Sequence, residues 1–203
     1  MMEFYCGETK IFPSLKGSLL IAHPSLKDPN FNRTVVLICH HSEQGALGLV
    51  LNRGLDVQIE KALSGEFKQF FPHQEFFQGG PVALSQMFVL HNEAQEAEIP
   101  EEEDMDDENL SVVVSEGIVF TENLIYLENE FNHPEKIKFF IGNSGWSPGQ
   151  LEAELLIGGW ILGKANSELV FDTPTQKIWG KALQFLGEPY SLISTWPLVP
   201  GLN

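Results

Sequence analysis

Short apolar runs of three to six residues recur along the chain, and most are bounded by Gly, Pro, Asn or His. Runs of this length that are rich in Val, Ile, Leu and Phe are typical of β-strands. Several follow one another at hairpin spacing, which favours antiparallel or mixed pairing. The predicted strands cover residues 18–22, 34–39, 46–51, 86–90, 111–114, 138–141, 160–162 and 169–171.

Helical periodicity appears in four segments between these runs, at residues 57–63, 122–131, 148–157 and 174–186. Ser147-Pro148 precedes the third segment and Thr173-Pro174 the fourth, and both match a capping Ser or Thr followed by Pro at the first helical position. The helices do not alternate regularly with the strands, which argues against a doubly wound parallel sheet. The pattern therefore predicts an α+β fold.

The length and composition indicate one folding unit. A chain of 203 residues can bury a sizeable single core, and 43% hydrophobic residues with 15 Phe and 4 Trp exclude wholesale disorder. We find no internal repeat and no linker that would divide the chain. We expect a single domain spanning residues 1–203.

The formal net charge is −16, and eight of the acidic side chains fall between positions 98 and 108. Low hydrophobicity and dense like charge predict a solvated acidic loop at about residues 92–109. The charge outside this loop is also negative, so a polyanion would be repelled unless a basic patch opposed it locally. We do not expect direct nucleic-acid binding.

The cysteines and the N-terminus indicate the cytoplasm. Cys6 and Cys39 do not form a C-x-x-C pair, and Cys39 lies in an apolar run, where a reduced thiol packed in the core is the usual outcome. The first residues lack the basic and apolar regions of a secretory signal. The longest apolar stretch, residues 155–163, is shorter than the roughly 20 residues that a membrane span needs.

Gln150 and Glu154 are the first candidate site residues. They lie one helical turn apart, so their side chains share a face of the predicted helix and could form the polar wall of a pocket. The structural alternative makes Gln150 the partner of the Ser147 cap and gives Glu154 a salt bridge or a cap contact with a neighbour such as Arg33 or Arg53. We take the structural explanation as the default, because the second Thr-Pro start needs no ligand.

His41, Asn52 and Arg53 lie on a predicted hairpin. The hairpin places His41 beside Gly45 and Ala46, with Asn52 and Arg53 at its far end near Arg33, so these residues need not share one site. His41 could act as an acid or base, and Arg53 could hold a carboxylate or phosphate. A hydrogen bond at the strand end and a structural ion pair are the alternatives.

Gly79 and Gly80 precede Pro81, and this combination predicts a tight turn whose N–H groups could face an anion. The sequence lacks a P-loop and a G-x-G-x-x-G helix start. It also lacks a G-x-S-x-G elbow, an H-E-x-x-H helix and a calcium loop. We therefore expect no metal site and no cofactor.

Several motifs together resemble one family. They are Gly17-Ser18-Leu19-Leu20-Ile21-Ala22-His23-Pro24, Phe31 with Arg33-Thr34-Val35-Val36, the hairpin to Arg53, Gly79-Gly80-Pro81 and the block from Gly145 to Glu154. In content and order they resemble the AlgH/YqgE family of bacterial proteins. Gly54 stands where that family usually has Pro, and Asn143-Ser144 where it commonly has Tyr-Ala.

The resemblance implies an α+β fold with a strongly coiled, partly barrel-like, mostly antiparallel or mixed sheet flanked by helices. It also implies a cytoplasmic protein of a family that carries a transcriptional-regulator label but has no accepted reaction or cofactor. We therefore expect a non-enzymatic protein that binds an unidentified small molecule or protein, with any effect on transcription being indirect.

The alternative is an enzyme of unassigned class that acts on a small anionic substrate. In that hypothesis His41 or Glu154 is the acid–base group, and Arg53 or the Gly79-Gly80 turn holds the anion. A purely structural role for every motif residue is the third possibility. Clustering of these groups around one concave pocket would favour an enzyme.

Overall fold

The computed structural model describes residues 13–55, 75–92, 111–122 and 135–195. Its strands are β1 (Ser18–Ala22), β2 (Val35–Ser42), β3 (Gly45–Val50), β4 (Phe76–Gln78), β5 (Val82–His91), β6 (Ser111–Ser115), β7 (Ile118–Thr121), β8 (Ile137–Trp146) and β9 (Trp160–Lys164). Its helices are α4 (Gln150–Leu156), α5 (Ile178–Phe185) and α6 (Tyr190–Ile193), with a π-helical turn at Glu168–Asp172 and a 3₁₀ turn at Thr175–Lys177.

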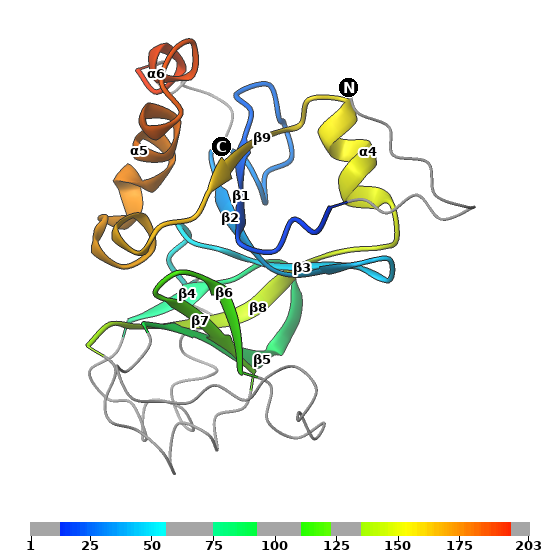
Figure 1. Ribbon diagram of the computed structural model, residues 1–203, viewed down its shortest axis with the longest axis vertical. Coiled ribbons are helices and arrows are strands. Elements are labelled where there is room, and N and C mark those ends of the chain that lie inside the picture. The colour runs from blue at the N-terminus through cyan, green and yellow to red at the C-terminus, as the bar shows by residue number, and fades with distance from the viewer. Residues whose placement is uncertain (1–12, 56–74, 93–110, 123–134, 196–203) are drawn as a thin grey trace.

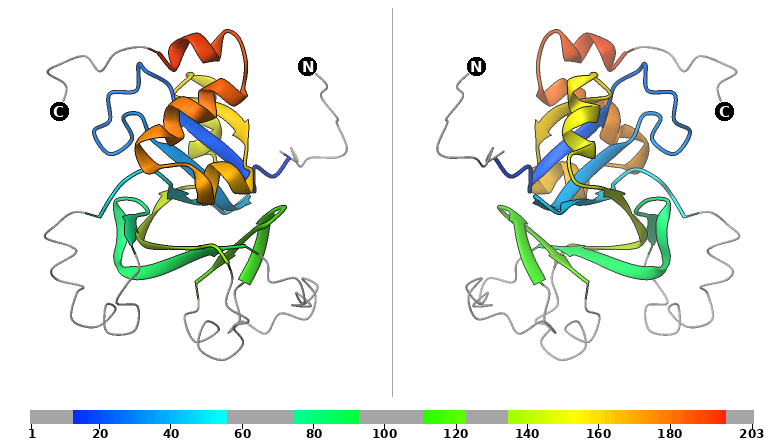
Figure 2. Two further views of the ribbon diagram at one scale, coloured as in Figure 1. Left: turned by 90° about the vertical axis from the view of Figure 1, so that its left-hand side faces the viewer. Right: turned by 90° about the vertical axis from the view of Figure 1, so that its right-hand side faces the viewer.

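The nine strands form one sheet in the order β6-β7-β5-β8-β3-β2-β1-β9, with β4 paired to β8 outside this path. All pairs are antiparallel except that of β4 with β8. The sheet curls into a partly closed barrel, with α5 and α6 on one side of its upper half and α4 on the other (Figures 1 and 2). The predicted α+β fold with a coiled sheet is therefore confirmed.

The upper half of the sheet, made of β1, β2, β3 and β9, carries a core on each face. Leu19 and Ile21 of β1 pack in the cluster that includes Trp179 of α5. Leu20, between them in the sequence, packs in the cluster that includes Leu151 of α4. Because neighbouring side chains on a strand point to opposite faces, a continuous apolar run can pack against a helix on each face of the sheet.

β8 joins the two halves of the sheet. Residues 144–146 pair with β3, and residues 137–141 and 143 pair with β5. Residues 139–141 pair with β4 as well as with β5, so β4 and β5 lie on opposite edges of β8. Gly142 directly follows the last residue of β8 that pairs with β4. Its φ is 70°, a left-handed conformation that favours glycine.

The connection from β4 to β5 crosses the backbone of β8 within three residues, Gly79, Gly80 and Pro81. A Cβ atom on Gly79 would lie 2.2 Å from the carbonyl oxygen of Gly142, and one on Gly80 would lie 2.2 Å from the carbonyl of Asn143. No side chain fits at such a separation. Glycine at both positions therefore allows the two backbones to touch.

Cys39 is free and buried on β2, as the sequence predicts for a thiol packed in the core. Burial raises the pKa of its thiol well above the ordinary value, and the negative charge of Glu122 adds to this effect. The thiol is therefore protonated and shielded in the folded protein.

Seven of the eight predicted strands are present, and the prediction for residues 169–171 is wrong. Those residues belong to the π-helical turn, where the side-chain oxygen of Asn166 accepts the Leu169 N–H at 2.8 Å. A run of three apolar residues does not distinguish a strand from a buried helical turn. β4, β7 and α6 were not predicted.

Both predicted helix starts are placed too early. α4 begins at Gln150 instead of residue 148. Gly149, the residue before it, has φ 75°, which lies outside the right-handed helical region, so the helix does not extend back to residue 148. α5 begins at Ile178 after a 3₁₀ turn, and the Thr173 hydroxyl donates to the Glu168 carbonyl oxygen instead of capping the helix. The predicted helix at 57–63, the helix at 122–131 beyond Glu122, and the acidic loop beyond Asn92 lie outside the described residues.

No helix among the described segments has both the length and the apolar character that a membrane span requires.

We expect Gly142→Ala to lower the free energy of unfolding by more than Gly158→Ala does. The two glycines have φ 70° and 74°, so each substitution incurs a left-handed strain of roughly 1–2 kcal/mol. A Cβ atom on Gly142 would also lie 2.7 Å from the Val82 carbonyl oxygen, whereas nothing lies within 4 Å at Gly158. Urea unfolding followed by far-UV circular dichroism measures both, and equal losses would contradict a tight crossing at β8.

Candidate functional site

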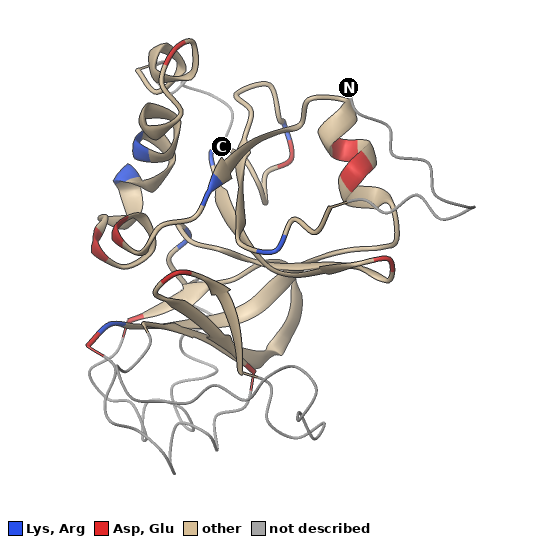
Figure 3. Cartoon of the chain, in the orientation of Figure 1, with Lys and Arg blue, Asp and Glu red and all other residues tan. Residues whose placement is uncertain are grey.

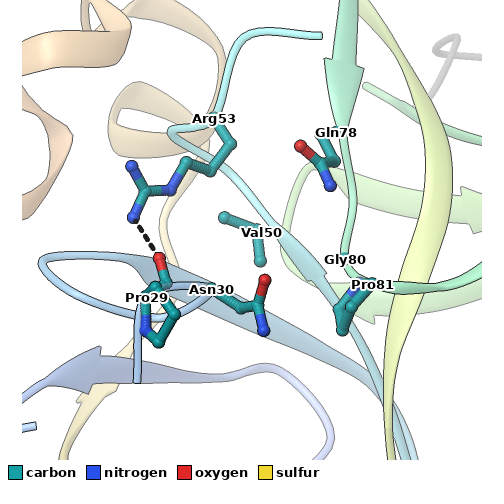
Figure 4. A pocket seen from close by; sticks show the side chains of 7 residues that line it. All are labelled: Pro29, Asn30, Val50, Arg53, Gln78, Gly80 and Pro81. Carbon is teal, nitrogen blue, oxygen red and sulfur yellow. Dashed lines mark hydrogen bonds between the residues drawn. The ribbon is translucent and has the colours of Figure 1, made fainter. Parts of the chain in front are cut away.

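The structure separates the predicted site residues into two groups. Arg53 and Gly80 line one cavity, whereas His41, Gln150 and Glu154 lie around α4. The cavity has a volume of about 220 Å³, and we call it the Arg53 pocket (Figure 4). Its lining residues are Pro29, Asn30, Val50, Arg53, Gln78, Gly80 and Pro81.

The loop before β2 forms one wall of the Arg53 pocket. The side chain of Asp28 accepts the backbone N–H of Asn30 at 2.8 Å, which is an Asx-type turn around Pro29. The other end of this loop is fixed by Asn52, whose amide accepts the Val35 N–H at 2.9 Å and donates to the Arg33 carbonyl oxygen at 2.8 Å. Asn52 thus joins the loop to the end of the hairpin instead of lining the pocket.

Arg53 extends from the turn after β3 towards the same loop. Its Nη2 donates to the carbonyl oxygen of Asn32 at 2.8 Å and to that of Pro29 at 3.3 Å, the second of which is drawn in Figure 4. Its own carbonyl oxygen accepts the N–H of Gln78 at 3.0 Å. Arg53 therefore holds the loop and β4 together across the pocket.

The opposite wall is the crossing segment over β8. The Gly79 carbonyl oxygen accepts the Val50 N–H at 2.8 Å, and the Gly79 N–H donates to the Ile141 carbonyl oxygen at 2.9 Å. The buried Ser144 hydroxyl donates to the same Gly79 carbonyl at 3.3 Å. The Gly79 N–H is thus used within the sheet and does not face an anion, so the predicted anion-binding turn can involve Gly80 only.

The guanidinium of the Arg53 pocket forms no ion pair with a carboxylate of the described ranges. Two of its nitrogens, Nη1 and Nε, have no hydrogen-bond partner there either. Since a guanidinium presents five N–H donors in a planar fork, this side chain can accept an anion without leaving the loop.

Glu154 is the centre of the second group. Its Oε2 accepts the indole N–H of Trp146 at 3.0 Å and that of Trp160 at 2.8 Å. Its Oε1 accepts from the side-chain amide of Gln150 at 3.0 Å, and Gln150 in turn accepts the Ser147 N–H at 3.1 Å. We call this arrangement the tryptophan clamp. It fixes α4 to β8 and β9, and neither Arg33 nor Arg53 takes part in it.

His41 connects three segments. Its Nδ1 accepts the backbone N–H of Leu15 at 3.1 Å, which leaves Nε2 as the donor to Glu152 at 2.8 Å. The strand pairing also places it opposite Ala46, as the hairpin predicts. Both ring nitrogens of His41 are therefore hydrogen-bonded within the protein.

The position predicted for Asn52 and Arg53, at the far end of the hairpin beside Arg33, is also confirmed.

Sequence reasoning missed Asn30 and Gln78 as pocket residues. Asp28-Pro29-Asn30 is a recognisable turn signature, and Gln78 directly precedes the two glycines. Neither signal indicates that these two segments meet, because they are far apart in the chain and come together only through β3 and β4.

Within the described ranges, no group of three or more His, Cys, Asp and Glu side chains is arranged to hold a metal ion.

Comparison with known proteins gives a consistent family. A family model described as AlgH-like matches residues 19–191. A UPF0301 protein of Chlorobaculum tepidum is 33% identical over 202 residues, which cover 96% of this chain and 100% of that protein. A UPF0301 protein of Pseudoalteromonas translucida is 35% identical over 188 residues, covering 89% and 96%.

Two solved structures share the fold. The solution structure of the AlgH protein from Pseudomonas aeruginosa has a TM-score of 0.64 and 27% identity, covering 98% of this chain and 100% of that one. The crystal structure of protein DIP2367 from Corynebacterium diphtheriae has a TM-score of 0.73 and 24% identity, covering 92% and 94%. The likeness to the second shows the fold alone.

We expect Glu154→Gln to lower the free energy of unfolding by about 1–3 kcal/mol, because charge-assisted hydrogen bonds are lost and one amide N–H would face another donor. Glu116→Gln, the same change at an exposed turn, is the matched control. Urea unfolding followed by circular dichroism gives the loss. The indole N–H resonances of Trp146 and Trp160 should shift in Glu154→Gln only, and unchanged resonances would contradict the clamp.

Proposed function

The chain belongs to the AlgH-like family, and from this premise we propose that it is a non-enzymatic cytoplasmic binding protein that holds a small anion at Arg53. The observation that carries the proposal is a half-buried guanidinium that lines a cavity and has no carboxylate partner among the described residues. A protein of net charge −16 supplies many carboxylates, so an arginine that pairs with none of those described is notable. An anionic ligand would complete its electrostatic environment.

The size of the Arg53 pocket supports a small ligand. Its volume of about 220 Å³ is below the roughly 300–1,000 Å³ typical of sites for drug-sized molecules. A whole nucleotide would not be enclosed there. A phosphate, a short carboxylic acid or the end of a longer molecule fits this volume better.

The chemistry of the lining supports binding over catalysis. Among the described residues that line it there is no His, Asp, Glu, Lys, Cys or Ser, so these residues offer no ordinary acid–base group or nucleophile. The acid–base candidates of the enzyme hypothesis, His41 and Glu154, are engaged in hydrogen bonds around α4. The residues expected to act together are thus distributed over two places.

The charge distribution supports an indirect role in any regulation of transcription. The described Lys and Arg residues are scattered over helices, strands and loops instead of gathering on one face, and α4 carries acidic residues (Figure 3). A nucleic-acid-binding surface would require a concentrated basic patch. A ligand-dependent contact with another protein is compatible with this acidic surface.

We expect inorganic phosphate or acetate to raise the melting temperature in an Arg53-dependent manner. At about 100 times the dissociation constant a ligand adds roughly 2.7 kcal/mol, which is several degrees for a chain of this length. Arg53→Lys keeps the charge but loses the planar fork, so we expect binding about tenfold weaker, and Arg53→Gln should abolish the shift. Differential scanning fluorimetry with chloride at equal ionic strength as the reference measures this.

Lys177→Gln is the control, because it removes one positive charge at an exposed position in the 3₁₀ turn before α5. Arg53 also holds the loop before β2, so only the difference between melting temperatures with and without anion is compared for each variant. An equal loss of the shift in Lys177→Gln would show that the anions act non-specifically and would refute the proposed site.

We also expect the purified protein not to retard a duplex DNA of about 25 base pairs at physiological salt, since the net charge of −16 opposes binding to phosphates. An electrophoretic mobility-shift assay tests this. Tight, sequence-selective retardation would mean that regulation is direct.

A further inference from the structure

Two carboxamide side chains lie in the Arg53 pocket in addition to the guanidinium. Asn30 comes from the loop before β2 and Gln78 from the end of β4, and they lie on different sides of Val50 (Figure 4). Neither side-chain amide has a hydrogen-bond partner among the described residues. The pocket therefore presents two amides and a guanidinium around one aliphatic side chain.

The two amides favour a ligand with more than an anionic group. Asn30 is exposed and Gln78 is half-buried, and each carboxamide has two N–H donors and one oxygen acceptor, so a ligand that displaces water from both must accept and donate. Inorganic phosphate at high pH and an ionised carboxylate are chiefly acceptors, so they leave the oxygens of Asn30 and Gln78 to water. A ligand with an amide next to its charge supplies both kinds of group.

The rest of the lining is apolar. Pro29 and Pro81 are exposed and present aliphatic surface to the cavity, whereas Val50, also among the lining residues, is 1% exposed. At about 30 Å³ for each water, the pocket volume of about 220 Å³ corresponds to roughly seven waters. This is room for a carboxylate, one amide and one medium-sized side chain.

We infer that the ligand of the Arg53 pocket is an N-acylated amino acid with an apolar side chain. Its carboxylate pairs with Arg53, its amide with Asn30 and Gln78, and its side chain packs between the exposed rings of Pro29 and Pro81. The inference rests on the proposed function, since it names the ligand class of the same site. The same chemistry occurs in a free N-acyl amino acid and in the C-terminal residue of a peptide.

The test compares three small probes by two-dimensional ¹H–¹⁵N NMR titration. N-acetyl-leucine has the carboxylate, the amide and the side chain, N-acetyl-leucinamide lacks the carboxylate, and acetate lacks the other two. We expect N-acetyl-leucine to bind at least tenfold tighter than either of the others, with shifts at Arg53, Gln78 and Gly80. Equal affinity of N-acetyl-leucine and its amide would overturn the inference.

Gln78→Met isolates the amide contact. It keeps the length and the uncharged state of the side chain, and the backbone N–H that bonds to Arg53 is retained. We expect it to weaken the binding of N-acetyl-leucine at least fivefold and that of acetate by less than twofold, and an equal loss for both ligands would contradict the amide contact. Gln44→Met, the same change in the exposed turn between β2 and β3, should alter neither.

The outcomes separate this inference from the proposed function. If acetate and phosphate bind through Arg53 but N-acetyl-leucine is no tighter, the ligand class is wrong and the anion site stands. If none of the probes binds, both are wrong.

A peptide of eight residues ending in Leu and its C-terminal amide identify the source of the ligand. If the free acid of the peptide binds at least as well as N-acetyl-leucine, the ligand class is supported with a peptide C-terminus as its source. If the peptide acid binds much more weakly while N-acetyl-leucine retains its advantage, the class is supported with a free small molecule as its source.

Discussion

The contact between the backbones of Gly79-Gly80 and β8 is the constraint on which the rest of the structure depends. β4 and β5 occupy opposite edges of β8, so the chain must pass over β8 between them. There the backbone of Gly79 and Gly80 lies so close to the backbone of β8 that no Cβ atom fits between them. This crossing places β4 between β8 and the residues that follow β3, and it thereby brings Gln78 and Gly80 to face Arg53 and the loop before β2.

The motif residues serve two separate structural tasks. Around α4 the carboxylate of Glu154 gathers two indole N–H groups and the Gln150 amide, while His41 connects the segment before β1 to Glu152. These groups satisfy one another. At the other end of the hairpin Asn52 is satisfied in the same way, whereas Arg53 keeps donors free of described partners. Unused hydrogen-bonding capacity therefore distinguishes the pocket from the clamp.

The sequence allowed most strands, the hairpin and the positions of its two ends to be predicted, because apolar runs and turn residues act locally. It placed the starts of α4 and α5 too early, since a matching Ser-Pro or Thr-Pro pair does not reveal that Gly149 takes a left-handed conformation. For Glu154 the structural expectation was a salt bridge or a cap contact with a neighbour such as Arg33 or Arg53, and the sequence did not indicate that two indoles, from β8 and β9, donate to it. Asn30 and Gln78 could not be found, because their meeting depends on the crossing over β8.

The two hydrogen bonds from Arg53 Nη2 to the carbonyls of Pro29 and Asn32 have a thermodynamic consequence. A free arginine side chain carries about 2 kcal/mol of rotamer entropy, which a binding site normally loses when its ligand arrives. Here much of that loss occurs when the protein folds. A bound anion would meet a guanidinium that is already held in place. The contacts of the anion would in turn restrict the motion of the loop before β2, so that this exposed segment would be more rigid when the pocket is occupied.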